Sequence, residues 1–184
     1  MNEVTAMAAK KTGFDPFVRE MLWEQLGAAI DMLENAVDAC PDELWGDQSR
    51  HPQFQFWYLV FHTLFWLDID LSGNSKNFAP PAPFALDELD PAGAYPDRVY
   101  TKHELKTYLA HDRNKLREVI RGLTEARARE RVVVPNADLP FLELLIYNMR
   151  HVQHHTAQLN WMLRLKIDSA PKWVRKTASP LGLE

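Results

Sequence analysis

The chain has 184 residues, a net charge of −4 and an isoelectric point near 6.0. This length suits a single domain, residues 1–184, and a hydrophobic fraction of 46% can supply a substantial core. The acidic balance argues against broad nucleic-acid binding, which usually needs a basic face. No stretch of about 18 uncharged apolar residues is present, so we expect no transmembrane helix.

The N-terminal residues 1–11 are polar and alanine-rich and lack the apolar core of a secretory signal. The cytoplasm is therefore the default location, and we expect residues 1–14 to be flexible. The chain has one cysteine, Cys40, which excludes an intrachain disulfide. Because it precedes Pro41 at an expected helix end, we interpret it as a small buried residue rather than a nucleophile.

The first predicted helix covers residues 16–39. Asp15 has the character of an N-cap, Pro16 suits the first helical position, and Pro41 stops the helix. Apolar residues recur at helical spacing between these points. The segment therefore reads as an amphipathic helix.

The second predicted helix, residues 53–71, is apolar on nearly every side and ends near Gly73. Such a helix should lie at the centre of the fold or at a subunit interface. Asp68 and Asp70 fall on other faces than His62, and we expect both on the surface.

Residues 73–100 hold five of the 12 prolines and predict a long irregular crossover with one short helical turn near Asp87. A loop of this length usually serves function or an interface. We expect residues 74–100 to cover a pocket.

The third predicted helix starts at Thr101, which forms a capping-box pattern with Glu104. Residues 131–135 read as extended, and a fourth helix runs over residues 140–166. Residues 168–184 should form a C-terminal arm. Four amphipathic helices with one long connection favour an all-α four-helix bundle, and we expect Trp173 to anchor the arm.

Two histidines in the fourth segment, His151 and His155, are four residues apart and so share one helical face. Two imidazoles at this spacing can bind one metal ion. His62 also points inward on the second helix. A lone inward histidine is more often a core residue, but three buried rings without partners would be costly. The pattern therefore favours a three-histidine metal site.

Other residues near this face have two readings. His154 could replace a ligand, but a role in the pocket or behind the ligands is preferred. Gln158 could serve the site, by bonding to a metal-bound water or by orienting a histidine ring, or it could simply bond to a neighbouring helix, and the two readings carry equal weight. The pocket is further expected to include Asn148, Tyr58 and Trp66, with Trp57 as a second tryptophan wall. His51 and His103 read as exposed, and the face of His111 is left open.

The segment Phe56-Trp57-Tyr58-Leu59-Val60-Phe61-His62, followed later by His151-Val152-Gln153-His154-His155-Thr156-Ala157-Gln158, resembles the DinB/YfiT-like family. The resemblance covers residues 16–166. It implies a four-helix bundle with the crossover between helices 2 and 3, and it implies metal ligands at His62, His151 and His155. The family often reads H-x-G-Q after the last ligand, whereas this chain has Ala157 in place of the glycine.

The resemblance implies a metal-dependent enzyme of the thiol-dependent S-transferase or hydrolase type, with an unidentified small-molecule substrate that includes a low-molecular-weight thiol among the candidates. Nickel or zinc is the expected ion, with iron or manganese as alternatives. Homodimers are frequent in this family, and we expect a homodimer through the first or second helix. No carboxylate at a diagnostic spacing offers a general base, which favours thiol activation over hydrolysis. The alternative is a non-catalytic metal-binding or stress-response module acting as a dimer. A bundle that serves only dimerisation, without metal, is the third reading.

Overall fold

A computed structural model describes residues 14–182 of the chain. The prediction that residues 1–14 are flexible falls, for residues 1–13, outside the described residues. Phe14, the one residue of this segment that is described, is buried in the core.

The first long helix, α1 (Pro16–Ala39), has the predicted bounds. The Asp15 side chain accepts a hydrogen bond from the backbone N–H of Phe17 at 2.9 Å, which caps one of the otherwise unpaired N–H groups at the helix start. Cys40 leaves the helical conformation just before Pro41. The capping aspartate and the two prolines therefore set both ends of this helix.

The next segment begins with a short helix, α2 (Asp42–Trp45), and a 3₁₀ turn, η1 (Pro52–Phe54), before α3 (Phe56–Ser72). The predicted helix start at residue 53 was early because the proline opens a separate turn. The left-handed φ of +60° at Gly73 ends α3. Nearly every side chain of α3 is buried, so the helix is central within one chain.

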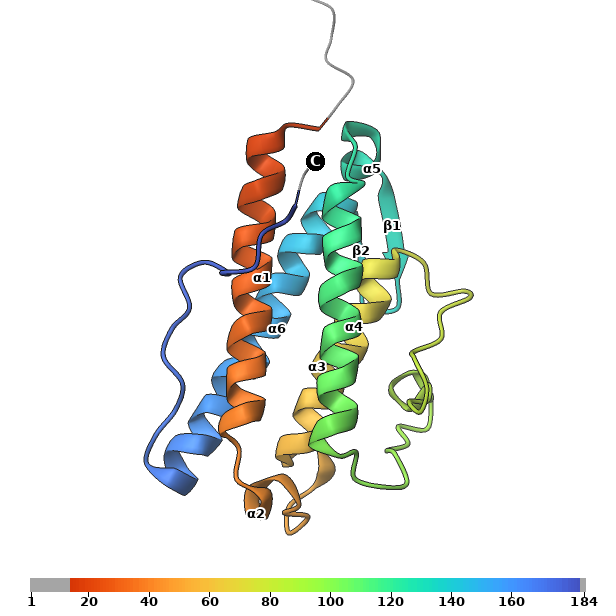
Figure 1. The fold of residues 1–184 in the computed structure, drawn as a ribbon. Helices are drawn as coiled ribbons and strands as arrows, with labels where there is room; N and C mark the ends of the chain where they lie inside the picture. Colours follow the sequence, from red (N-terminus) through yellow and green to blue (C-terminus); the bar gives the residue numbers. More distant parts are fainter. Residues whose placement is uncertain (1–13, 183–184) are drawn as a thin grey trace, which may run out of the picture.

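The connection after α3 runs back along the bundle to the start of α4 (Lys102–Arg121), because α3 and α4 are parallel (Figure 1). The predicted short turn is present as η2 (Asp87–Leu89). Both hydrogen bonds of the capping box between Thr101 and Glu104 are also present, which confirms the predicted start of α4.

A short helix, α5 (Glu125–Arg129), and a hairpin of β1 (Arg131–Val134) and β2 (Ala137–Pro140) lead into α6 (Phe141–Ile167). The predicted extended segment corresponds to β1. Its antiparallel partner β2 was not predicted, since its sequence lacks an apolar alternation.

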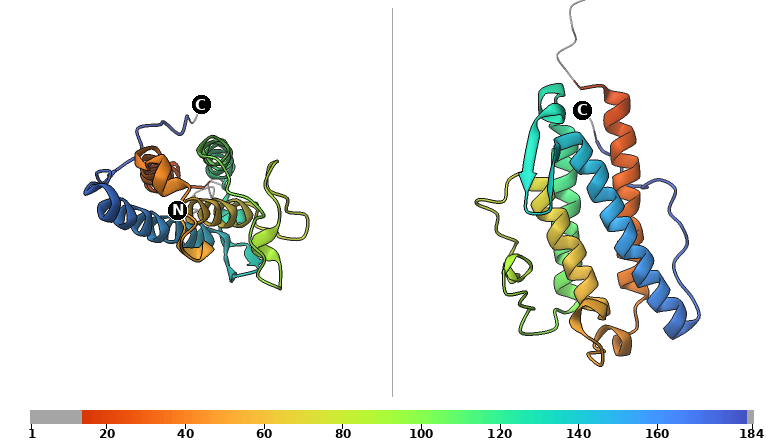
Figure 2. Two further views of the ribbon diagram at one scale, coloured as in Figure 1. Left: turned by 90° about the horizontal axis from the view of Figure 1, so that it is seen from below. Right: turned by 180° about the vertical axis from the view of Figure 1, so that it is seen from behind.

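The four long helices pack as a ring in which α1 contacts α6 and α4, and α3 contacts the same two helices (Figure 2). Their apolar faces meet in one core. This arrangement confirms the all-α four-helix bundle with a long crossover between the second and third long helices. It also places α3 and α6 side by side, which matters for the histidines they carry.

The C-terminal arm crosses α1 and reaches α4 (Figure 1). The indole N–H of Trp23 donates to the Ser179 carbonyl at 2.6 Å, and Leu181 is fully buried. The prediction that Trp173 anchors the arm was wrong: its side chain is 67% exposed. The anchor is instead the buried leucine near the end of the arm, together with the hydrogen bond from α1.

Across residues 14–182, no helix combines the length and the hydrophobicity that crossing a bilayer requires.

Candidate metal centre

Three histidines meet where α3 and α6 lie side by side. His62 comes from α3, and His151 and His155 come from successive turns of α6. One ring nitrogen of each lies within 4.8 Å of the others, and the Nε2 atoms of His62 and His151 are 3.5 Å apart. The structure therefore brings together the three residues that the sequence singled out, although 89 positions separate the first two along the chain.

The protonation of these rings suits ligand binding. Burial, with a smaller contribution from the neighbouring histidines, lowers the pKa of His151 to about 3. Burial also lowers the pKa of His155 to about 4. Both rings are thus neutral near pH 7, and a neutral imidazole keeps the lone pair that a metal ion needs.

A carboxylate that sequence reasoning missed, Glu88 in η2, lies directly behind His62. It accepts hydrogen bonds from Nδ1 of His62 at 2.8 Å, from the Trp66 indole at 2.9 Å and from the Tyr58 hydroxyl at 2.5 Å. Burial alone would raise the pKa of Glu88, but these hydrogen bonds bring it below its ordinary value. The carboxylate is therefore ionised, and it fixes the proton of His62 on Nδ1 and the lone pair on Nε2.

The ring of His155 is oriented in the same way. Nδ1 of His155 lies 2.7 Å from the amide oxygen of Gln158, one turn along α6. This contact places the proton on Nδ1 and leaves Nε2 available. Of the two readings for Gln158, the geometry matches the one in which it orients a histidine.

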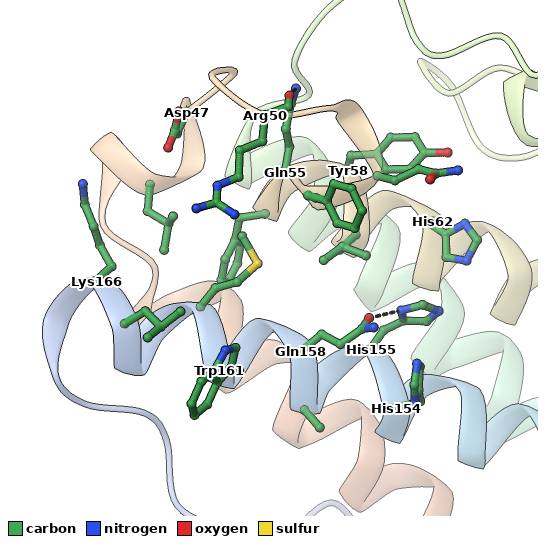
Figure 3. Close-up of a pocket in the computed structure, with 18 of the residues that line it drawn as sticks. Asp47, Arg50, Gln55, Tyr58, His62, His154, His155, Gln158, Trp161 and Lys166 are labelled. Atoms are coloured by element: carbon green, nitrogen blue, oxygen red, sulfur yellow. Dashed lines mark hydrogen bonds between the residues drawn. The ribbon is translucent and has the colours of Figure 1, made fainter.

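An open cavity of about 1050 Å³ begins at these histidines and runs along α6 towards its C-terminal end (Figure 3). His62, His155 and Glu88 contribute to its wall. Most of the remaining wall is apolar, including Phe54, Leu59, Trp161, Met162 and Leu165. A cavity of this size and character can hold a small organic molecule.

The other residues expected in the pocket divide into two groups. His154 is exposed and lines the cavity beside His155, and Tyr58 lines it while donating to Glu88. Trp66 contacts the same carboxylate from behind the histidines. Two residues lie elsewhere: Asn148 is buried and donates to the Leu67 carbonyl, and Trp57 donates to Gln55 within the core.

The remaining histidines lie outside this group. His51 and His103 are exposed, as expected, and His111 is exposed on α4. His111 belongs to a second group of possible ligand atoms, with Asp68 and Asp112. However, the Lys115 ammonium group already forms an ion pair with Asp68 at that point. A cation is thus present in the fold itself, which disfavours a metal ion there.

The prediction that Asp68 and Asp70 lie on the surface was wrong, since both are only 1% exposed. Asp68 is compensated by Lys115 and by the Tyr108 hydroxyl at 3.0 Å. Asp70 has no hydrogen-bond partner among the described residues. Because α3 is surrounded on all sides, side chains on the faces that do not carry His62 are buried as well.

Together, the fold and this group define a class: a four-helix bundle whose adjacent second and last long helices bring three histidines together beside a cavity. The donor set fits a divalent transition metal, since Glu88 and Gln158 hold Nδ1 of His62 and of His155 and leave Nε2 as the ligand atom, and the buried Nδ1 of His151 has no partner within residues 14–182. A family model described as the DinB superfamily matches residues 25–159, and the chain belongs to this superfamily. Searches of curated proteins and of solved structures gave no match.

Proposed function

We propose that His62, His151 and His155 hold one divalent metal ion and that the protein is a metal-dependent enzyme acting on a small molecule. One observation carries the proposal: the three ring nitrogens lie within 4.8 Å of one another, and two of the three residues, His62 and His155, line an open cavity. A structural site has no need of an adjoining cavity, whereas a catalytic site must admit a substrate.

The chemistry that the ion would supply is Lewis acidity, which lowers the pKa of a coordinated thiol or water and so generates a nucleophile near neutral pH. Within the described part of the chain, the group contains three histidines and no fourth ligand. Three protein ligands leave positions for substrate, which favours the enzyme over a saturated structural module.

The chain's own residues position and shield the site. Glu88 holds the His62 ring, and Gln158 holds the His155 ring. Glu88 accepts three hydrogen bonds that stabilise its charge, so it is a weak base and a positioning residue rather than a proton acceptor. Within residues 14–182, His154 is the other basic side chain beside the histidines, with its ring centroid 5.1 Å from that of His155. No carboxylate belongs to the histidine group itself, which favours thiol activation over hydrolysis.

The substrate class proposed is a small molecule that includes or reacts with a low-molecular-weight thiol, as in S-transfer. The mostly apolar cavity supports an organic substrate. Residues 74–100 were expected to cover the pocket, but of this range only Glu88 forms part of the cavity wall. Nickel or zinc is the proposed ion, because imidazole ligands suit both.

The test is elemental analysis of untagged protein beside a His62→Ala/His155→Ala double variant. We expect near-stoichiometric nickel, zinc, iron or manganese in the wild type only. Metal-free wild type, even after incubation with each ion and dialysis, would overturn the proposed site. A bound ion with four saturated protein ligands would instead support the non-catalytic module.

We further propose a homodimer, for which the sequence offered the first or second long helix. The second of these, α3, is covered within its own chain. On α1, however, Phe17 and Met21 are exposed one turn apart, which favours α1 as the interface. A monomeric mass in solution at micromolar concentration would contradict the dimer.

A further inference from the structure

The cavity has two chemically different ends. The histidines lie at one end, and the cations Arg50 and Lys166 line the other, with Asp47 beside them (Figure 3). Neither cation forms an ion pair with any residue in the described range 14–182. The Asp47 carboxylate accepts the Ser49 backbone N–H at 2.9 Å, and it offsets only one of the two positive charges. The far end therefore carries a net positive charge.

One face of α6 connects the two ends. His155, Gln158, Met162 and Leu165 recur at helical spacing along the cavity, and Lys166 follows at its end. The eleven positions from His155 to Lys166 correspond to about 16 Å of helix. The lysine side chain leans back towards the N-terminus of the helix, so the gap between its ammonium group and His155 is shorter than this length of helix. The gap suits an extended chain of roughly eight to ten bonded heavy atoms.

The wall between the ends is apolar and poorly covered. The side chains of Trp161 and Leu165 are 60% and 70% exposed, and Phe54, which comes from η1 and lines the same cavity, is 60% exposed. Large apolar side chains gathered at a cavity rim are characteristic of a binding site, because their burial by a ligand is favourable.

From this juxtaposition we propose the substrate class: an elongated molecule with an apolar body, a terminal anionic group held by Arg50 and Lys166, and a donor at its other end that reaches the histidine cluster. The metal end rests on the proposed function, whereas the cationic end stands on the cavity alone. Carboxylate, sulfonate and phosphate share the required charge. Neutral apolar compounds would occupy the same wall without the contact to the cations.

The cationic end can be tested in metal-free protein by calorimetric titration with octanoate and with octanol. We expect octanoate to bind about fivefold to tenfold more tightly, with the preference falling as salt rises. An Arg50→Gln/Lys166→Gln variant should lose this preference. An Arg164→Gln/Lys172→Gln variant removes the same charge from exposed positions outside this cavity and should keep it. Equal binding of the two probes, or an unchanged preference in the first variant, would overturn the proposal.

The metal end can be tested in cobalt-loaded protein with ω-mercaptooctanoate against octanoate. We expect tighter binding of the thiol and a near-ultraviolet cobalt–thiolate absorption band that octanoate does not produce. A cobalt-loaded protein without this band would overturn the two-ended substrate. Failure to bind cobalt would overturn the proposed function and the metal end with it, while the octanoate comparison would still decide the cationic end.

Discussion

Nδ1 of His62 donates a hydrogen bond to the carboxylate of Glu88 at 2.8 Å and so joins α3 to the crossover. The same carboxylate accepts from Tyr58 and Trp66, so three side chains of one helix hold it in place. Carboxylates behind ligand histidines fix the tautomer and raise the basicity of the ring. The crossover is thus part of the candidate metal centre.

Replacing this carboxylate should weaken metal binding without removing a ligand. We expect Glu88→Gln to lower metal affinity about tenfold to a hundredfold, because the neutral amide stabilises the ligating histidine less. Competition with a chromophoric chelator would measure the change. Asp97→Asn, an exposed position in the same crossover, serves as the control and should bind as the wild type does. Equal affinity of the glutamine variant and the wild type would refute the positioning role.

Two adjacent histidines on α6 allow a matched test of the ligand set. His155→Ala removes one of the three converging nitrogens, so we expect metal occupancy after dialysis to fall below about a tenth of the wild-type value. His154→Ala removes an exposed ring that is outside the group and should leave occupancy unchanged. Full occupancy without His155 would exclude the proposed site, and loss of metal with the other variant would exchange the roles of the two residues.

The sequence predicted the long helices well where local residues mark their ends. The bounds of α1 follow from Asp15 and the flanking prolines, and the capping box marks the start of α4. The histidine group was also predictable, because two members are one turn apart and the third lies on an inward face. The helix ends and the His151–His155 pair depend on residues close together in the chain, and the inward direction of His62 follows from the apolar pattern of its own helix.

What the sequence could not show depends on contacts between distant segments. Glu88 lies 26 positions from His62 in an irregular loop, where no periodicity fixes the direction of a side chain. The burial of Asp68 likewise depends on Lys115, which comes from α4. The one local indication of Glu88 was its place in the single short turn expected within the crossover, near residue 87.

The only cysteine should be chemically inert in the folded protein. Cys40 is 2% exposed, and burial raises its pKa to about 12, so almost no thiolate is present near neutral pH. We expect less than about a tenth of an equivalent to react with an aromatic disulfide reagent within minutes, and full reaction in denaturant. Rapid reaction of the native protein would revive this thiol as a candidate nucleophile.

Asp70 should give the folded protein an unusual pH dependence. Burial raises its pKa to about 7, whereas an unfolded aspartate titrates near 4. Between about pH 4 and about pH 7 the folded chain therefore binds more protons than the unfolded chain, and the contribution of Asp70 to the free energy of unfolding falls as pH rises. At about pH 8 the carboxylate is charged, buried and, among the described residues, without a hydrogen-bond partner.

We therefore expect Asp70→Asn to stabilise the protein at about pH 8 by about 2–4 kcal/mol, and we expect this gain to disappear near pH 4. Urea unfolding of metal-free protein across this pH range measures the difference in stability between wild type and variant. Metal-free protein is used because the histidines then titrate in the same way in the two proteins. Glu143→Gln, an exposed acid on α6, should change stability little at any pH. A gain that is the same at both ends of the range would mean that the substitution acts through packing, because only a change in proton binding makes the difference depend on pH.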